Sequence, residues 1–462
     1  MVTRMQHMSY ICIVGLVLVV IAGCGGGVEN AGPRREVPGI SDSRSPISQA
    51  AEEASASEVD YHGWRALRLT NGMVTVVAVP DIGGRIVEYK LGGHPFLWVN
   101  PAELGKTYPL PRSEQDRVWH DFGGYKVWPA PADRWKGPPD PLGSELDGGK
   151  WTGKVLTASG RNVEVELRSP EDKVTGLQIT RTIKLFGGSS QVRVSEKITN
   201  ISRESQTWAF CQLAQVPGSV ESGERYSEKS RLYVPLEADG ANREGYVTLA
   251  QGGGGQFKVL PDRMLQVSYR GEAGKIGMTS FAGWLAHVDE EHEFGFVQRF
   301  EASKLGDYPD KSNVVVETSG EQSYMQVGIC APLRALRPGE SVELATDWYA
   351  TRVGGPVVST TEVAAIQVPL EVARADGKLK LQGKLGVFAP GNLALSLQDE
   401  AGKLIGQPIT IKASPAEIVK LDRELPNEAT AKTLLVELQN DSGTPLGRIA
   451  ELSLATAIAS AK

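Results

Sequence analysis

The chain has 462 residues, with 49 lysine and arginine residues against 55 aspartate and glutamate residues, for a formal net charge of −6 at pH 7. A mildly acidic surface lacks the basic patch that nucleic-acid-binding proteins present, so we expect no nucleic-acid partner. The length is sufficient for more than one folded domain.

The first 23 residues have the layout of an export signal. Arg4 precedes an apolar run, residues 11–21, which is shorter than the roughly 20 residues that a membrane-spanning helix needs. The stretch Ile-Ala-Gly-Cys at residues 21–24 resembles the lipobox of bacterial lipoproteins, in which the cysteine carries a lipid after cleavage. We therefore predict cleavage before Cys24 and membrane attachment through lipid on Cys24. Arg4 is the only residue of the Lys, Arg, Asp and Glu types that cleavage removes, so with histidine neutral the mature chain has a net charge of −6 − 1 = −7.

Residues 24–57 are predicted to form a disordered tether. They are rich in glycine, proline, serine, alanine and glutamate and contain few large apolar side chains, so they cannot bury enough surface to become ordered. No acidic residue directly follows Cys24, which favours the outer membrane. We therefore expect the folded part to lie in the cell envelope, on the periplasmic or the outer surface.

The remaining chain is predicted to be all-β. Apolar and polar residues alternate in short segments separated by glycine, asparagine and proline, and long segments of helical period are missing. All nine tryptophans precede a break at residues 353–356, and residues 357–462 contain a single aromatic residue of the Phe, Trp and Tyr types, Phe388. We predict a large antiparallel β domain at residues 58–352 and a small immunoglobulin-like sandwich at residues 357–456. The alternating segments include residues 73–79, 162–168, 178–185, 191–198, 314–317, 341–346, 379–387, 393–398, 432–438 and 449–454.

A tryptophan-rich segment, residues 98–151, holds five of the nine tryptophans. Its many prolines and glycines argue against a regular helix or a central strand, so we predict a long structured loop. Flat aromatic rings beside charged groups suit a sugar, and the candidate contacts in this segment are Tyr125, Lys126, Trp128 and Trp135. The alternative is an aromatic cluster that seals one end of a sandwich, because buried tryptophan usually serves packing.

Three groups of residues occur in an order that resembles the galactose-mutarotase-like domains of the aldose 1-epimerase superfamily. The resemblance covers about residues 60–352 and is greatest to an uncharacterised exported bacterial branch. It implies a large antiparallel supersandwich with a sugar site on one face. The groups are residues 71–72 with 83–89, residues 181–184 with 192–200 and 208–210, and residues 314–318 with 336–341 and 348–349.

The resemblance also implies candidate catalytic residues. In this superfamily a carboxylate takes the proton from the anomeric hydroxyl and a histidine donates one to the ring oxygen. Glu317 falls at the position of the glutamate, whereas Trp208 stands where the family motif His-x-Tyr-Phe-Asn-Leu has its histidine, and Gln212 corresponds to the asparagine. We expect Trp208 and Gln212 to contact the sugar even without catalysis. His120 could supply the acid instead. Arg85 either reaches the site or is a surface residue of its strand.

Other candidate sites are weaker. Cys211 and Cys330 could pair, but the pattern favours two separate buried thiols, each in an apolar strand. The acidic and histidine-containing residues 287–293 could offer metal ligands, but we predict a solvated hairpin turn there. The sequence has no closely spaced Cys/His set, and we expect neither a metal nor a cofactor.

These features lead to one main hypothesis and two alternatives. The main one is a lipid-anchored envelope protein that binds carbohydrate through an aromatic-rich cleft without catalysis. The first alternative is an aldose 1-epimerase-like or other sugar-active enzyme that uses Glu317 and His120. The second is a structural or assembly lipoprotein of the envelope.

Overall fold

The computed structural model describes residues 52–111, 118–131, 144–219, 229–237, 245–250, 252–375 and 377–455. Cys24, Trp135 and most of the predicted tether lie outside these residues. Regular structure in the described ranges consists of antiparallel strands and short 3-10 helices, which confirms the all-β prediction. No helix in these ranges is long and apolar enough to cross a membrane. The 3-10 helices are η1 (Pro80–Ile82), η2 (Pro101–Glu103) and η5 (Pro309–Lys311).

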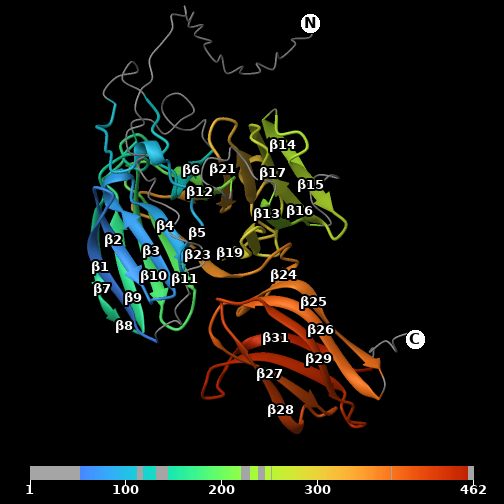
Figure 1. Ribbon diagram of the computed structural model, residues 1–462. Helices are drawn as coiled ribbons and strands as arrows, with labels where there is room; N and C mark the ends of the chain where they lie inside the picture. The colour runs from blue at the N-terminus through green and yellow to red at the C-terminus, as the bar shows by residue number, and fades with distance from the viewer. Residues whose placement is uncertain are drawn as a thin grey trace, which may run out of the picture. The chain divides into compact units, whose positions relative to one another are not determined.

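The first sheet contains 13 strands (Figure 1). Their order is β14-β17-β20-β21-β12-β6-β4-β3-β2-β1-β8, with β22 paired to β12 and β5 paired to β4. The strands are β1 (Ala54–Tyr61), β2 (Trp64–Thr70), β3 (Val74–Val79), β4 (Arg85–Leu91), β5 (His94–Pro95), β6 (Tyr125–Ala130), β8 (Ser159–Gly160), β12 (Gln206–Pro217), β14 (Tyr246–Ala250), β17 (Gly274–Met278), β20 (Val314–Thr318), β21 (Tyr324–Cys330) and β22 (Arg334–Leu336).

The second sheet contains ten strands in the order β15-β16-β13-β18-β19-β23-β11-β10-β9-β7. Neighbouring strands pair in antiparallel fashion, and β18 and β19 form a hairpin. The prediction of a solvated turn over residues 287–293 was wrong for residues 287–289, which are buried in β18, so the turn is limited to residues 290–293. The strands are β7 (Thr152–Thr157), β9 (Asn162–Arg168), β10 (Leu177–Phe186), β11 (Val192–Asn200), β13 (Ser230–Pro235), β15 (Phe257–Leu260), β16 (Met264–Ser268), β18 (Trp284–Asp289), β19 (Phe294–Phe300) and β23 (Ser341–Arg352).

The chain then forms two four-stranded sheets of its own, drawn in orange and red in Figure 1. Their orders are β24-β25-β26-β29 and β28-β27-β30-β31, and they enclose a separate aliphatic core. The strands are β24 (Ser359–Thr360), β25 (Ala364–Ala375), β26 (Lys378–Val387), β27 (Gly391–Gln398), β28 (Leu404–Ala413), β29 (Val419–Pro426), β30 (Thr433–Gln439) and β31 (Pro445–Ser453).

The core between the first two sheets follows from period-two alternation. In β10 every second residue is buried, including Ile179, Ile183 and Leu185, and in β11 Val192 and Val194 are buried in the same way. Successive side chains of a strand point to opposite faces, so each strand contributes one apolar face to the core. Each fully buried aliphatic side chain stabilises the fold by roughly 1.5–3 kcal/mol.

One buried ion pair interrupts this apolar core. The Arg181 Nε donates to Glu196 Oε1 at 2.7 Å, and both side chains are inaccessible to solvent. The Tyr125 hydroxyl of the first sheet donates to the same carboxylate oxygen at 3.0 Å, and Arg181 Nη1 donates to the Gly84 carbonyl. The pair therefore links the second sheet to the strand and the turn of the first sheet that carry Tyr125 and Gly84.

The prediction of a loop throughout residues 98–151 was wrong for β6. This strand, which contains Pro129, lies between β12 and β4 in the first sheet. It pairs with β12 over six residues but with β4 only at Tyr125 and Ile86. Beyond Tyr125, β6 does not pair with β4. Pro129, which lacks a backbone N–H, is therefore tolerated in this strand.

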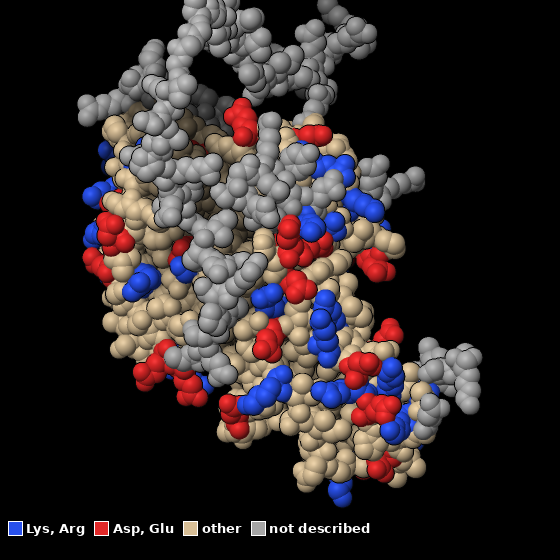
Figure 2. Space-filling model, in the orientation of Figure 1, with Lys and Arg blue, Asp and Glu red and all other residues tan. Residues whose placement is uncertain are grey.

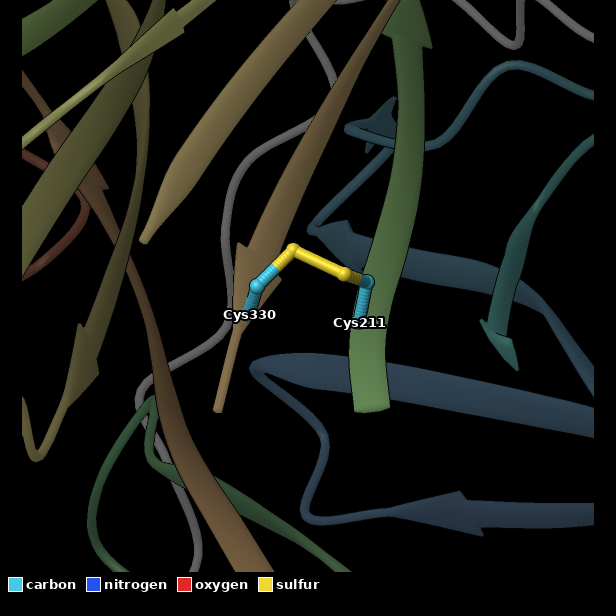
Figure 3. The surroundings of a disulfide bond; sticks show 2 residues. All are labelled: Cys211 and Cys330. Carbon is cyan, nitrogen blue, oxygen red and sulfur yellow. A yellow bond between two sulfur atoms is a disulfide. The ribbon is translucent and has the colours of Figure 1, made fainter. Parts of the chain in front are cut away.

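The preference for separate thiols was also wrong, because Cys211 and Cys330 form a disulfide (Figure 3). The two residues are directly opposite each other on β12 and β21, with a Cα–Cα distance of 4.0 Å. They are 119 residues apart in the chain, and only the strand register brings them together.

Charged side chains of both signs are distributed over the surface. Lysine and arginine are intermingled with aspartate and glutamate on the face in Figure 2, and no large basic area is visible there. The absence of a basic area on this face agrees with the mildly acidic composition.

Candidate functional site

The outer face of the first sheet, opposite the core, carries the candidate site. In β6, Tyr125 and Val127 belong to the core, so Lys126 and Trp128 project to the outer face. Directly paired residues of antiparallel strands share a face. Leu213 pairs with Lys126 and therefore also lies on the outer face.

Asp147 organises one end of this face. Its Oδ1 atom accepts hydrogen bonds from Arg85 Nη2 at 2.8 Å and from Trp128 Nε1 at 2.9 Å. Lys126 Nζ lies 3.4 Å from the same oxygen and 3.7 Å from the centroid of the Trp128 ring. Trp119, 46% exposed, adds a second ring 5.6 Å from Lys126 Nζ. We call these five residues the Asp147 cluster.

Burial and charge set the ionisation of this cluster. Burial lowers the pKa of Lys126 to about 8, although Asp147 and Asp121 favour its charged form. Burial would raise the pKa of Asp147, but Lys126 and Arg85 outweigh burial and hold that pKa below its usual range. At neutral pH Asp147 is therefore ionised and Lys126 is mostly protonated.

Two glycines allow Asp147 to approach the sheet so closely. A Cβ atom at Gly83 would overlap the Asp147 carbonyl oxygen, and one at Gly84 would lie 2.7 Å from Trp151 Cδ2. The Gly83 N–H donates to the Gly149 carbonyl at 2.8 Å. The glycine pair that precedes Arg85 is thus required by the return of residues 144–151 onto this end of the sheet.

A second group of polar and aromatic residues lies further along the same face. Gln215 Nε2 donates to both carboxylate oxygens of Asp121, at 3.2 and 3.3 Å. The rings of Trp98 and Tyr324 are 4.6 Å apart between centroids, and the backbone N–H of Trp98 donates to the backbone carbonyl of Gln215. Burial and the neighbouring Asp121 carboxylate raise the pKa of Tyr324, so its hydroxyl stays protonated. We call these four residues the Tyr324 group.

A row of polar residues crosses four neighbouring strands of the outer face. Lys275 pairs with Glu317, Glu317 with Gln326, and Gln326 with Gln215, so all four side chains project from the same side. Lys275 Nζ lies 3.2 Å from Glu317 Oε2, and both side chains are about two-fifths exposed. The row ends at the Tyr324 group, through Gln215.

The structure brings four of the predicted site residues onto one face and leaves three on the other. Arg85, Lys126, Trp128 and Glu317 share the outer face. The other three are buried on the core side of their strands, so they do not contribute to a site on the outer face. These are Tyr125, Trp208 and Gln212.

His120 lies between Trp119 and Asp121 in the chain, and its side chain contacts Tyr108 and Glu103. Its ring stacks on Tyr108 at 3.4 Å between centroids, and its Nδ1 lies 3.6 Å from Glu103 Oε1. The pairing of His120 with Glu317 as acid and base stays a prediction. The remaining predicted residues, Trp135 and Cys24, lie outside the described residues.

Several residues of the outer face escaped the sequence analysis. Trp98 and Asp121 lie in the tryptophan-rich segment, and the high density of aromatic residues there could have indicated them as site residues. Asp147 lies in the same segment, but its contact with Arg85 arises only because residues 144–151 return to the first sheet. Gln215 and Tyr324 gave no signal, because their contribution depends on strand register.

The described ranges contain no group of three or more His, Cys, Asp and Glu side chains that could hold a metal ion. A cavity of about 1260 Å³ is lined by residues of both large sheets and by Phe388. From the first sheet it is lined by Gln212, a predicted site residue, and Cys330, and from the second by Arg193, Asp347 and Tyr349. The lining of this cavity includes none of the Asp147 cluster.

Comparisons with solved structures identify remote matches. A galactose mutarotase-like protein from Clostridium acetobutylicum is 14% identical over 65% of this chain and 100% of its own, with a TM-score of 0.43. A putative aldose 1-epimerase from Escherichia coli K12 is 12% identical over 65% of this chain and 100% of its own, with a TM-score of 0.38. No residue role is transferred at this similarity.

A TPR-domain-containing protein from Parabacteroides distasonis is 13% identical over 66% of this chain, with a TM-score of 0.45, and the chain spans half the length of that protein. No match was found among curated proteins. A family model described as a domain of unknown function, DUF4380, matches residues 65–351. Because this match covers more than half of the sequence, the chain belongs to the DUF4380 family.

Proposed function

We propose that the protein binds carbohydrate through the outer face of its first sheet. The observation that carries the proposal is the Asp147 cluster, in which an exposed ring, Trp119, lies beside the buried Lys126 and Asp147. Sugar rings offer apolar C–H faces that pack on aromatic rings, and their hydroxyls need charged or amide partners. Sites of this kind combine apolar walls with a few fixed polar groups.

The rigidity of the cluster also supports binding. Asp147 holds the Trp128 indole and the Arg85 guanidinium at once, and Lys126 is fixed between the carboxylate and the ring. Groups that are already in place lose little conformational entropy when a ligand arrives. The cluster therefore favours recognition without a large rearrangement.

We favour binding without catalysis over epimerisation. An epimerase needs a base and an acid that both reach one sugar ring. Glu317 is paired with Lys275, whereas His120 is stacked on Tyr108, and Trp208 lies on the core side. The proposal includes the predicted lipid on Cys24, which would place the outer face among glycans of the cell envelope.

A glycan array probed with the purified chain tests this function. We expect binding to a subset of glycans and at least a tenfold loss of affinity in Trp119→Ala. The Trp119 ring is exposed, so its removal should leave the fold intact. Leu156→Ala is the matched control, because Leu156 is an exposed apolar residue of β7 in the second sheet. Absence of binding to any glycan, or equal binding by Trp119→Ala and the parent chain, would overturn the proposal.

A further inference from the structure

The cavity of about 1260 Å³ lies where the second sheet loses a strand. Strand β19 ends at Phe300, so among the described strands β11 alone pairs with residues 341–345 of β23. In this stretch Val342 and Leu344 pack against the core, whereas Ala345 is exposed. All three line the cavity, so it passes the edge of β23 and extends from the outer surface of the second sheet into the space between the two sheets.

Gln212 presents an unpaired amide nitrogen to this cavity. The residue is 4% exposed and lies on the core side of β12, opposite Ile329, which also lines the cavity. No described residue accepts a hydrogen bond from Gln212 Nε2. The Tyr125 hydroxyl is close to this amide but outside hydrogen-bond geometry, and it donates to Glu196 at 3.0 Å. A buried donor without an acceptor is unfavourable, and a ligand that supplies an acceptor oxygen would remove this penalty.

The charges of the lining favour a neutral ligand. Among the described lining residues, four arginines stand beside six carboxylates, so no excess of positive charge is present to attract an anion. At the outer end, Arg193 Nε and Nη2 donate to the two carboxylate oxygens of Asp347 at 3.0 and 2.7 Å, so this cation is already matched. A charged group beside Gln212 would lose its hydration near apolar side chains such as Ile329 and Val342.

A small hydroxylated molecule matches both the amide and the apolar walls. A primary amide offers N–H donors and a carbonyl acceptor, and a hydroxyl can accept from the first and donate to the second. The C–H groups of a sugar can pack on the aliphatic side chains beside Gln212. Pockets that hold small molecules usually have volumes of about 300–1,000 Å³, so this cavity is large enough for a mono- or disaccharide.

We propose that this cavity is a second binding site, which takes a neutral mono- or disaccharide and holds one of its hydroxyls on the Gln212 amide. The site is separate from the Asp147 cluster, none of whose residues lines it. The inference therefore stands apart from the proposed binding of glycans by the outer face of the first sheet, and each can fail without the other.

Calorimetric titration of the purified chain with neutral sugars tests this site. Glucose, galactose, mannose, maltose, lactose and cellobiose serve as probes, with glucuronate and glucosamine as the anionic and cationic counterparts of glucose. We expect at least one neutral sugar to bind, and the charged sugars to bind more weakly. Gln212→Leu, which removes the amide, should weaken this binding at least tenfold. Ala345→Trp, which fills part of the cavity from an exposed position, should do the same.

Gln298→Leu is the matched control. Gln298 is 1% exposed, lies on the core side of β19 with Phe296, and has an unpaired amide oxygen, but it is absent from the described lining of the cavity. This variant should bind the sugar as the parent chain does. Urea unfolding checks every variant, and Gln212→Leu should have a midpoint equal to or above that of the parent, because an apolar side chain replaces an unpaired amide.

Several results would overturn the inference. They are absence of binding to every neutral probe, tighter binding of a charged sugar, unchanged affinity in Gln212→Leu or in folded Ala345→Trp, and a lower urea midpoint in Gln212→Leu, which would show that the amide has a structural partner. Loss of the binding in Trp119→Ala but not in Gln212→Leu would also overturn it, while supporting glycan binding by the outer face of the first sheet.

Discussion

Replacement of Gly84 by alanine tests how tightly residues 144–151 are packed onto the first sheet. Gly84 has φ +61°, where an L-residue costs about 1–2 kcal/mol. The added methyl group would also overlap the Trp151 indole, and overpacking of this kind costs typically about 1–3 kcal/mol. We therefore expect Gly84→Ala to lower the free energy of unfolding by about 2–5 kcal/mol.

A matched glycine separates the two contributions. Gly188 has φ +68°, but a Cβ atom there would meet nothing within 4 Å, so Gly188→Ala carries the backbone cost alone. Urea unfolding followed by tryptophan fluorescence measures both variants under identical conditions. Equal losses in the two variants would show that Trp151 moves aside without cost, which would refute the packing argument. A larger loss in Gly84→Ala, together with weaker glycan binding, would support it.

Three further predictions concern pH, redox state and catalysis. Burial lowers the pKa of His94 to about 3 and of His287 to about 4, from 6.5. The native state then binds fewer protons than the unfolded state below pH 6.5, so the free energy of unfolding should fall as pH drops from 6.5 towards 4; equal urea midpoints at pH 7 and 5 would contradict this. The double variant Cys211→Ser with Cys330→Ser should lose about 4 kcal/mol, because the disulfide closes a long loop, and dithiothreitol should destabilise the parent chain but not the variant. In polarimetry of fresh α-glucose we expect no rate above buffer; an enhancement that Glu317→Gln abolishes would establish the epimerase alternative.

The strands of this protein could be read from its sequence, because alternation is a local property. The alternating segment at residues 162–168 coincides with β9, and the segment at 314–317 lies within β20. In β6 the alternation of Tyr125, Lys126, Val127 and Trp128 even indicates which side chains share a face. The prolines and glycines around this strand favoured a loop, so the strand was not predicted.

Most of the candidate site depended on information that a single sequence does not contain. Asp147 is distant from Arg85 in the chain, and their contact arises because the glycine pair accepts a returning loop. The alignment of Glu317 with Gln326 and Gln215 is a matter of strand register, which local patterns do not specify. For the same reason the disulfide was not predicted, because its cysteines are far apart in sequence and only the strand register places them opposite each other.

The ion pair between Arg181 and Glu196 has a consequence for how related sequences can diverge. Loss of one partner would leave a buried charge uncompensated, at a cost of about 3–5 kcal/mol, whereas joint replacement by apolar residues of similar volume can be nearly neutral. Substitutions at these two positions should therefore be correlated. Among chains that share this core, we expect both charges to be retained or both to be lost, with intermediates that keep a single charge being rare.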